Sequence, residues 1–377
     1  MNIEPALKAL AAALHGEGPA VELSTALDGS PVVSPVQTPG FDDAVVVVRT
    51  SGSTGMPKAT VLTVEALAAS SMATALALKG EGQWLLALPV QYVAGLQVLV
   101  RSLFAGTRPW AMDLSAGFTP DAFTAAALEL TDRIRFTSLV PTQLQRLLDS
   151  PAPETLAVLR RFNSILLGGA PASAELLQAA REAGLRVVTT YGSAETCGGC
   201  VYDGVPIEGV KVKVSDTGRI LLGGDTIAAG YLDDPDLTAD AFIEEDGLRW
   251  FRTNDLGSIN AEGILTVLGR SDDVVITGGV KVSAAHVQAE LEKLDGVTAA
   301  FVTGVPSEEW GQAVAAYVAV ADDSPQGISG FTARRYDLLG PLAPKTVLAA
   351  PELIMLPNGK PDRLAMTELL NELHQGK

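Results

Sequence analysis

The residues best suited to chemistry lie between residues 49 and 58, in the run Arg-Thr-Ser-Gly-Ser-Thr-Gly-Met-Pro-Lys. Glycines let the backbone approach an anion closely, hydroxyl and backbone N–H groups donate to phosphate oxygens, and a lysine neutralises charge. The glycine and lysine spacing does not fit a Walker A loop. A flexible surface loop is the alternative for this composition. We interpret the run as a polyphosphate-binding loop of Thr50, Ser51, Gly52, Ser53, Thr54, Gly55 and Lys58.

The flanking sequence predicts the elements that hold this loop. Residues 44–48 form an uninterrupted apolar run, which is typical of a buried strand. Residues 62–78 are rich in alanine and other small residues, and we predict a helix there. A strand, a loop of glycine and hydroxyl residues and then a helix would form a cradle for phosphate groups.

Strands and helices alternate through the region that follows. Strands are predicted at residues 84–89, 133–139, 163–167 and 185–189, and helices at residues 141–148 and 173–184, with a further apolar helix ending at Ala105. This alternation predicts an α/β fold with mostly parallel sheets flanked by helices. Ligands of such sheets bind beyond the carboxyl ends of the strands, where the connecting loops lie.

The length and composition predict more than one domain. A chain of 377 residues with 47% hydrophobic residues can bury a sizeable core and exceeds the usual size of one domain. Short strands with glycine turns at residues 211–231 predict a small β subdomain, and residues 272–377 predict a smaller α+β domain. We therefore expect a large N-terminal domain over residues 1–270 and a C-terminal domain over residues 272–377.

The charge and the termini restrict the function. A net charge of −17 argues against nucleic acid or an anionic membrane surface as a partner. No apolar run reaches the roughly 18 residues that a membrane-spanning helix needs. Residues 1–20 carry Glu4 and lack a basic region before an apolar core, so they do not predict a secretory signal. A cytoplasmic enzyme is expected.

Cys197 and Cys200 form a C-x-x-C motif, which suggests a redox pair or half of a zinc site. Zinc would need two more ligands, and the only histidines are His15, His286 and His374. A redox motif would be expected at the start of a thioredoxin-like unit, which the surrounding pattern does not predict. We interpret the cysteines as structural thiols, with a dithiol redox protein as the alternative.

Arg101 is a charged residue within the apolar stretch Leu96–Phe104. A buried charge costs free energy unless it is paired or solvated. It could lie on a solvated face or pair with a structural carboxylate. Alternatively, its guanidinium could bind a substrate carboxylate, for which the planar fork is well suited.

Glu195 lies in the run Thr190-Tyr191-Gly192-Ser193-Ala194-Glu195, which follows a predicted strand. A hard carboxylate oxygen beside a triphosphate suits Mg²⁺. The alternative is an exposed glutamate in a turn, because short motifs are weakly specific.

Taken in order, these motifs resemble those of the adenylate-forming enzymes, the acyl-CoA synthetases and their relatives. The resemblance covers about residues 40 to 370 and rests on the loop before Lys58, on Thr190–Glu195, on Asp255, on Gly269–Asp273 and on Pro357–Lys360. It implies ATP and Mg²⁺ as cofactors and coenzyme A as co-substrate. No protein nucleophile is required, and no Ser-His-Asp arrangement is evident.

The resemblance also implies roles for individual residues, and these complete the expected site. It implies that Gly169 and Ala170 line one face of the adenine and that Thr190, Tyr191 and Gly192 line the other, that Glu195 binds Mg²⁺ with Thr50, and that Asp255 and Arg270 contact ribose or phosphate. It also implies that Lys360 is the adenylation lysine and Asp272 the hinge between the domains. Gly278, Gly279 and Lys281 would form the loop for the thioester step.

The implied reaction has two steps. A carboxylate is a poor electrophile, so transfer to AMP makes a mixed anhydride that a thiol can attack. Thr50, Glu195 and Lys360 are the expected catalytic residues, since they would stabilise charge on the phosphates. Rotation about Asp272 would then replace Lys360 with the loop around Gly278.

Within this family, several stretches resemble the o-succinylbenzoate–CoA ligases of menaquinone biosynthesis in a short bacterial form: Leu88–Arg101, Ser138–Leu144, Val201–Pro206 and Leu356–Arg363. Gln91 and Tyr92 stand where family members often carry histidine. The region before the phosphate loop is short, so a homodimer is also expected. The alternatives are a ligase for another aryl or fatty acid and an inactive adenylate-binding module.

Overall fold

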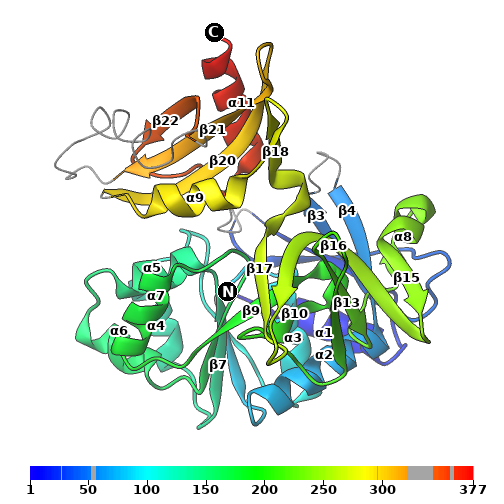
Figure 1. The fold of residues 1–377 in the computed structure, drawn as a ribbon. Coiled ribbons are helices and arrows are strands. Elements are labelled where there is room, and N and C mark those ends of the chain that lie inside the picture. The colour runs from blue at the N-terminus through cyan, green and yellow to red at the C-terminus, as the bar shows by residue number, and fades with distance from the viewer. Residues whose placement is uncertain (27, 52–56, 295, 321–342, 357–360, 377) are drawn as a thin grey trace. The chain divides into compact units, whose positions relative to one another are not determined.

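The computed structural model describes residues 1–26, 28–51, 57–294, 296–320, 343–356 and 361–376 (Figure 1). The described residues divide into two units. Unit 1 comprises Met1–Lys213, Leu221–Thr253 and Asn260–Leu265, and unit 2 comprises Val214–Ile220, Asn254–Ile259 and Thr266–Lys377. The α/β fold class predicted from the sequence is confirmed, with four sheets and flanking helices.

The largest sheet has seven strands and lies in unit 1. Their order is β11 (Val205–Pro206), β10 (Gly198–Tyr202), β9 (Val187–Ser193), β8 (Ser164–Leu167), β7 (Arg135–Leu139), β5 (Gln83–Leu86) and β6 (Trp110–Ala111). The strands from β9 to β6 are parallel to one another. Strand β10 pairs antiparallel with β9, and β11 pairs antiparallel with β10. The parallel strands end at one edge, so the loops after Leu86, Leu139 and Leu167 lie there.

Helices cover this sheet because its strands are apolar on both faces. The helices of unit 1 are α1 (Glu4–Leu14), α2 (Val64–Ala77), α3 (Val93–Phe104), α4 (Pro120–Leu128), α5 (Pro141–Leu148), α6 (Pro153–Leu159), α7 (Ala174–Glu182) and α8 (Pro235–Ala241). Helices α4 to α7 gather beside β7 in Figure 1. Their buried side chains, among them Phe123, Leu144 and Leu159, form one core with Leu85 and Ile165 of the sheet.

A second sheet of unit 1 carries the predicted phosphate loop. Its strand order is β14 (Gly230–Tyr231), β4 (Pro57–Thr63), β3 (Ala44–Ser51), β1 (Val21–Thr25) and β2 (Pro31–Pro35). The predicted succession of strand, loop and helix is wrong here, because strand β4 stands between the loop and helix α2. Residues 60–63 contain the β-branched Thr60, Val61 and Thr63, which favour a strand. The helix begins only at Val64, where the Thr63 hydroxyl accepts from the Ala66 N–H at 3.2 Å.

A third sheet follows the seven-stranded one in the chain. Its strands are β12 (Val210–Val214), β13 (Arg219–Gly224), β16 (Leu248–Ile259) and β15 (Phe242–Glu245), with β17 (Leu265–Arg270) also paired to β16. Short strands with glycine turns were predicted for residues 211–231, which contain most of β12 and all of β13 of this sheet.

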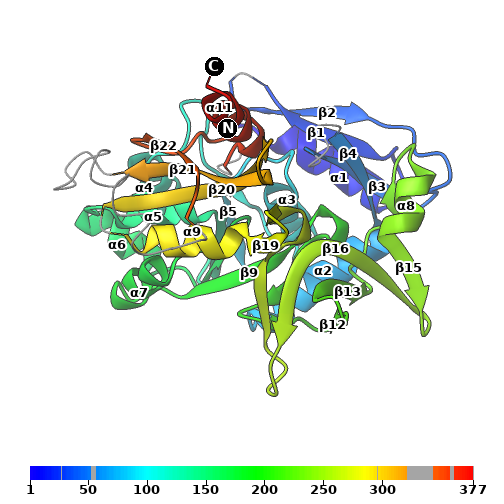
Figure 2. The same cartoon turned by 45° about the horizontal axis from the view of Figure 1, so that its top comes forward.

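In the described part of unit 2, a sheet lies between two helices (Figure 2). Its strands are β19 (Val280–Ser283), β18 (Val274–Thr277), β21 (Gly311–Val320), β20 (Val297–Ser307) and β22 (Thr346–Ala350), and its helices are α9 (Ala284–Glu292) and α11 (Arg363–His374). Strand β21 is buried on both faces: Val314 and Ala316 pack in the core of α9, and Ala313 and Tyr317 in that of α11. This alternation explains its continuous apolar run.

Candidate nucleotide site

The hairpin of β3 and β4 positions both ends of the predicted phosphate loop. Thr50 pairs directly with Lys58, and Ser51 with Pro57, so the loop joins two antiparallel strands. Gly52, Ser53, Thr54 and Gly55 lie outside the described residues. The hairpin places the Thr50 and Lys58 backbones side by side, as a loop closed around an anion requires.

Glu195 is held in a short 3₁₀ turn, η1 (Ala194–Thr196), between β9 and β10. Only 8% of the residue is exposed, so it is not an exposed turn glutamate. Its backbone carbonyl accepts from the Ala228 N–H at 2.9 Å. Its Oε1 accepts from the Tyr231 hydroxyl at 2.8 Å. A buried carboxylate with this single described side-chain donor retains acceptor capacity for another ligand.

Tyr231 connects Glu195 with the phosphate hairpin, and it was not among the predicted site residues. Its strand β14 pairs with β4, where Tyr231 stands opposite Thr60. The Lys58 ammonium lies 5.2 Å from the centroid of the Tyr231 ring. Burial, followed by the charge of Glu195, raises the pKa of the Tyr231 hydroxyl, which therefore stays protonated. The sequence offered only a Gly-Tyr pair after a glycine turn as a signal.

The two stretches predicted to line the adenine are neighbours in the structure. Strands β8 and β9 are paired in parallel, and the Thr190 hydroxyl donates to the Leu167 carbonyl at 3.3 Å. A Cβ on Gly168 would lie 2.3 Å from the Thr190 hydroxyl oxygen, so a larger residue would displace that hydroxyl from its contact with β8. Gly169 and Ala170 therefore follow β8 beside Thr190, Tyr191 and Gly192 of β9. Thr190, Tyr191, Gly192 and Ser193 of the motif lie within β9, which continues past its predicted end, whereas Glu195 lies in η1.

The side chains around Glu195 suit Mg²⁺, which needs few protein ligands, better than a metal ion that is held by several protein side chains. Among the residues that the structure describes, no group of three or more His, Cys, Asp or Glu side chains could hold a metal ion. Mg²⁺ usually takes one or two carboxylates and completes its octahedron with water and substrate phosphates. The buried Glu195 carboxylate, joined through Tyr231 to the phosphate hairpin, matches this pattern.

Arg101 lies in the last turn of α3 and is only 6% exposed. Its guanidinium carbon lies 5.2 Å from the ring centroid of Trp84, and its Nε has no hydrogen-bond partner among the described residues. Trp84 is near the start of β5, whereas α3 begins close to the carboxyl end of that strand, at Val93. The cation is thus buried on an aromatic ring, about 12 Å along the helix from Val93.

Gln91 and Tyr92, which stand where family members often carry histidine, lie just before α3. The Gln91 side chain contacts the Thr25 hydroxyl, and the Tyr92 carbonyl accepts from the Leu96 N–H at 3.0 Å. A Cβ on Gly95 would lie 2.2 Å from the Pro89 carbonyl oxygen, so this helix approaches the preceding loop too closely for any other residue.

Cys197 and Cys200 are free and fully buried. Burial raises the pKa of both thiols, that of Cys200 to about 12. Reactive cysteines have lowered pKa values and partial exposure. The Cys197 carbonyl accepts from Gln97 Nε2 at 2.6 Å and from the Ser70 hydroxyl at 3.2 Å. These features support the structural interpretation.

The predicted ribose contacts lie in unit 2. Asp255 is on β16, and Arg270 ends β17, which pairs with β16. The Ser271 hydroxyl donates to the Asn254 carbonyl at 3.0 Å. Asp255 and Arg270 are therefore close along the paired strands. The side chain of the predicted hinge, Asp272, lies outside the described side chains, although its backbone forms the turn η2 (Ser271–Asp273).

The predicted thioester loop is a turn between β18 and β19. Gly278 has φ +55°, and a Cβ there would lie 2.7 Å from the Trp310 ring. The Gly278 N–H also donates to the Trp310 carbonyl at 3.0 Å. Gly279 has φ +81°. The Lys281 side chain and the whole of Lys360 lie outside what the structure describes.

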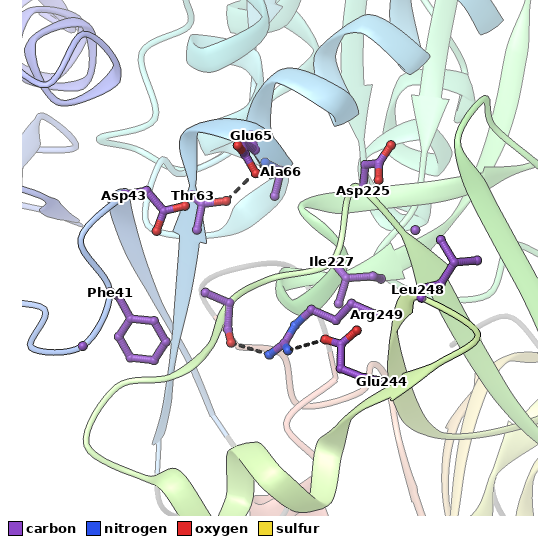
Figure 3. A pocket seen from close by; sticks show the side chains of 14 residues that line it. Phe41, Asp43, Thr63, Glu65, Ala66, Asp225, Ile227, Glu244, Leu248 and Arg249 are labelled. Atoms are coloured by element: carbon purple, nitrogen blue, oxygen red, sulfur yellow. Dashed lines mark hydrogen bonds and ion pairs between the residues drawn. The ribbon is translucent and has the colours of Figure 1, made fainter.

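A hollow of about 550 Å³ lies elsewhere on unit 1 (Figure 3). Asp43, Glu65, Asp225 and Glu244 line it, and Arg249 donates to Glu244 at 3.1 Å. None of the predicted site residues lines this hollow.

Comparisons with known proteins agree with these motifs. The family model for AMP-binding enzymes matches residues 4–232. A probable 2-succinylbenzoate–CoA ligase of Mycobacterium tuberculosis is 42% identical over 331 residues, which cover 86% of this chain and 84% of that one. Within the described residues, no helix is long and apolar enough to cross a membrane.

Solved structures show the same fold. ATP-bound MatB from Rhodopseudomonas palustris has a TM-score of 0.77 at 26% identity, over 89% of this chain and 70% of that chain. The o-succinylbenzoate CoA synthetase of Bacillus subtilis with its acyl-adenylate intermediate has a TM-score of 0.72 at 25% identity, with the same coverage. That synthetase is also known with ATP and a magnesium ion, with a TM-score of 0.71 at 25% identity over 90% of this chain and 72% of that one.

The family match spans more than half of the chain, and its motifs fold into one hairpin and two adjacent strands around a buried glutamate. The chain belongs to the family of AMP-binding enzymes.

Proposed function

We propose that this enzyme ligates o-succinylbenzoate to coenzyme A through an acyl-adenylate, with release of AMP and pyrophosphate, in menaquinone biosynthesis. The observation that carries the proposal is the 42% identity to a probable 2-succinylbenzoate–CoA ligase over most of both chains. ATP, Mg²⁺ and coenzyme A are the cofactor and co-substrates. The Bacillus subtilis synthetase, whose structures hold the acyl-adenylate or ATP with magnesium, supports the same reaction.

The residues of unit 1 would act on the phosphates. Thr50 and Lys58, at the base of the phosphate hairpin, would donate to the phosphate oxygens and place a positive charge beside them. Glu195, with Thr50, would hold Mg²⁺, which neutralises phosphate charge when bound. Gly169 and Ala170, which follow β8, would line one face of the adenine, and Thr190, Tyr191 and Gly192 of β9 the other.

The residues of unit 2 would complete both half-reactions. Asp255 would accept from the ribose hydroxyls, with Arg270 beside it on the paired strand. Lys360 would stabilise charge during adenylation. Rotation about Asp272 would then present Gly278, Gly279 and Lys281 for the thioester step. Residues 1–270 and 272–377 are the proposed domains of this motion.

A parallel assay of pyrophosphate release tests the function. The enzyme is given ATP and Mg²⁺ with o-succinylbenzoate, benzoate or a medium-chain fatty acid, with and without coenzyme A. We expect release with succinylbenzoate alone, and a thioester only when coenzyme A is present. Release with another acid would contradict the substrate and keep the reaction class. ATP binding without release for any acid would favour an inactive adenylate-binding module.

The resemblance alone carries the proposal that Arg101 binds the second carboxylate of the substrate; its position on the Trp84 ring, toward the start of β5, does not support it. We expect Arg101→Ala to raise the KM for o-succinylbenzoate roughly 10–100-fold, since a charged hydrogen bond contributes about 1.5–3 kcal/mol. The KM for ATP should not change. An equal rise in the KM for ATP, with a lower melting temperature, would contradict this role and would show that Arg101 acts by packing on Trp84.

A cytoplasmic location and a homodimer complete the proposal. Cys197 and Cys200 are free thiols in the structure, which agrees with a reducing compartment.

A further inference from the structure

We propose that Tyr231 is a positioning residue that fixes the Glu195 carboxylate for the metal and holds Lys58 apart from it. This inference rests on the proposed function, because it assigns Glu195 to magnesium and Lys58 to phosphate. Tyr231 lies far along the sequence from both residues and reaches them through the pairing of β14 with β4.

The hydroxyl of Tyr231 fixes one carboxylate oxygen without neutralising it. It donates to Glu195 Oε1 at 2.8 Å, and both residues are buried. A lysine or arginine in this place would cancel the negative charge that a metal requires. A neutral phenol donor orients the carboxylate, leaves its charge in place and leaves Oε2 as an acceptor.

The surroundings hold the ring itself still. The Tyr231 N–H donates to the Thr238 hydroxyl at 2.9 Å, and that hydroxyl donates to the Asp234 carbonyl at 2.8 Å. The ring packs edge-on against Phe242, with centroids 5.4 Å apart. A donor on so constrained a ring can set the orientation of its partner, which is the usual work of a residue behind a metal ligand.

The face of the same ring carries Lys58. Its ammonium lies 5.2 Å from the ring centroid, a cation–π distance. Within the described part of the chain, Lys58 forms no ion pair with Glu195. Direct pairing of these groups would use up the cation meant for phosphate and the anion meant for metal. The ring therefore keeps both charges close together and available.

Tyr231→Phe tests the hydroxyl while keeping the ring and its contact with Lys58. We expect Mg²⁺ to bind roughly 10–100-fold more weakly, as on loss of other partners behind a metal ligand. The readout is Mn²⁺ or Mg²⁺ titration in the presence of ATP, by calorimetry or by the electron spin resonance of Mn²⁺. Because this needs no acyl acid, it succeeds or fails independently of the substrate assignment.

Tyr202→Phe is the matched control. Tyr202 is also buried, and its hydroxyl lies 3.0 Å from the Thr74 hydroxyl. Its replacement should cost similar stability and leave metal binding unchanged. Tyr231→Leu, which also removes the ring face, should in addition weaken ATP binding, because Lys58 can then pair with Glu195.

A double-mutant cycle separates positioning from general stability. If Tyr231 acts through Glu195, Tyr231→Phe should have no further effect on metal binding once Glu195 is glutamine. Equal metal affinity of Tyr231→Phe and the unchanged enzyme would overturn the proposal, as would additive losses in the cycle. Failure of the unchanged enzyme to bind metal with ATP would overturn the magnesium assignment itself, and the positioning role with it. Metal binding with ATP but no turnover of any acid would count against the proposed function alone.

Discussion

Glu195→Gln should lower the rate of adenylate formation roughly 10²–10³-fold, the usual cost of removing one group that stabilises transition-state charge. Glutamine keeps the shape of the side chain and can still accept from Tyr231. It has no negative charge for Mg²⁺, and its amide presents a donor where an acceptor stood. The measurement is the rate of pyrophosphate release over a range of Mg²⁺ concentrations, in which partial rescue at high Mg²⁺ is expected.

Glu65→Gln serves as the control for this substitution. Glu65 is an exposed carboxylate in the first turn of α2, and it contributes the same formal charge to the protein. It should leave both the rate and the Mg²⁺ dependence unchanged. A Glu195→Gln enzyme with full activity at low Mg²⁺ would show that the buried carboxylate has only a structural role.

Gly192→Ala should destabilise unit 1 and abolish nucleotide binding at ordinary temperature. A Cβ on Gly192 would lie 2.1 Å from the carbonyl oxygen of Gly198, on the paired strand β10. Backbone atoms on both strands would have to separate, which we expect to cost about 3 kcal/mol. The melting temperature should fall by about 6–12 °C. Thermal unfolding with and without ATP measures the effect.

Gly263→Ala is the control that lacks the steric clash expected for Gly192→Ala. Gly263 has φ +80° and nothing within 4 Å of an added Cβ, so alanine there meets only the cost of the left-handed backbone, about 1–2 kcal/mol. A loss at Gly192 no larger than this would mean that β9 and β10 separate easily. The glycine would then be needed for the nucleotide alone.

The sequence by itself determined the family and much of the secondary structure. Patterns of apolar residues located α5, β7 and β8 closely, because each element repeats its buried positions with one period. The order of short motifs identified the AMP-binding family, which the comparison confirmed. The motif residues, however, were assigned roles one by one, without any knowledge of which of them touch.

Local patterns failed where pairing between distant strands decides the structure. The stretch Pro57–Thr63 follows a glycine-rich loop and precedes an alanine-rich helix, so its first residues were predicted as loop and its last as helix. It forms β4 because β3 and β14 on either side satisfy its backbone hydrogen bonds. The end of β9 was likewise underestimated, since β10 extends the pairing through Tyr191 and Gly192.

Tertiary structure alone decided how the charges of the site are kept apart. Lys58 and Glu195 were predicted as separate members of the site, and neither motif predicts a side chain that lies between them. Pairing of β14 with β4 brings in Tyr231, whose ring takes the cation on its face and whose hydroxyl reaches the carboxylate. Such an arrangement depends on residues distant in sequence that meet only once the sheet has formed, so no periodicity or motif spacing could have indicated it.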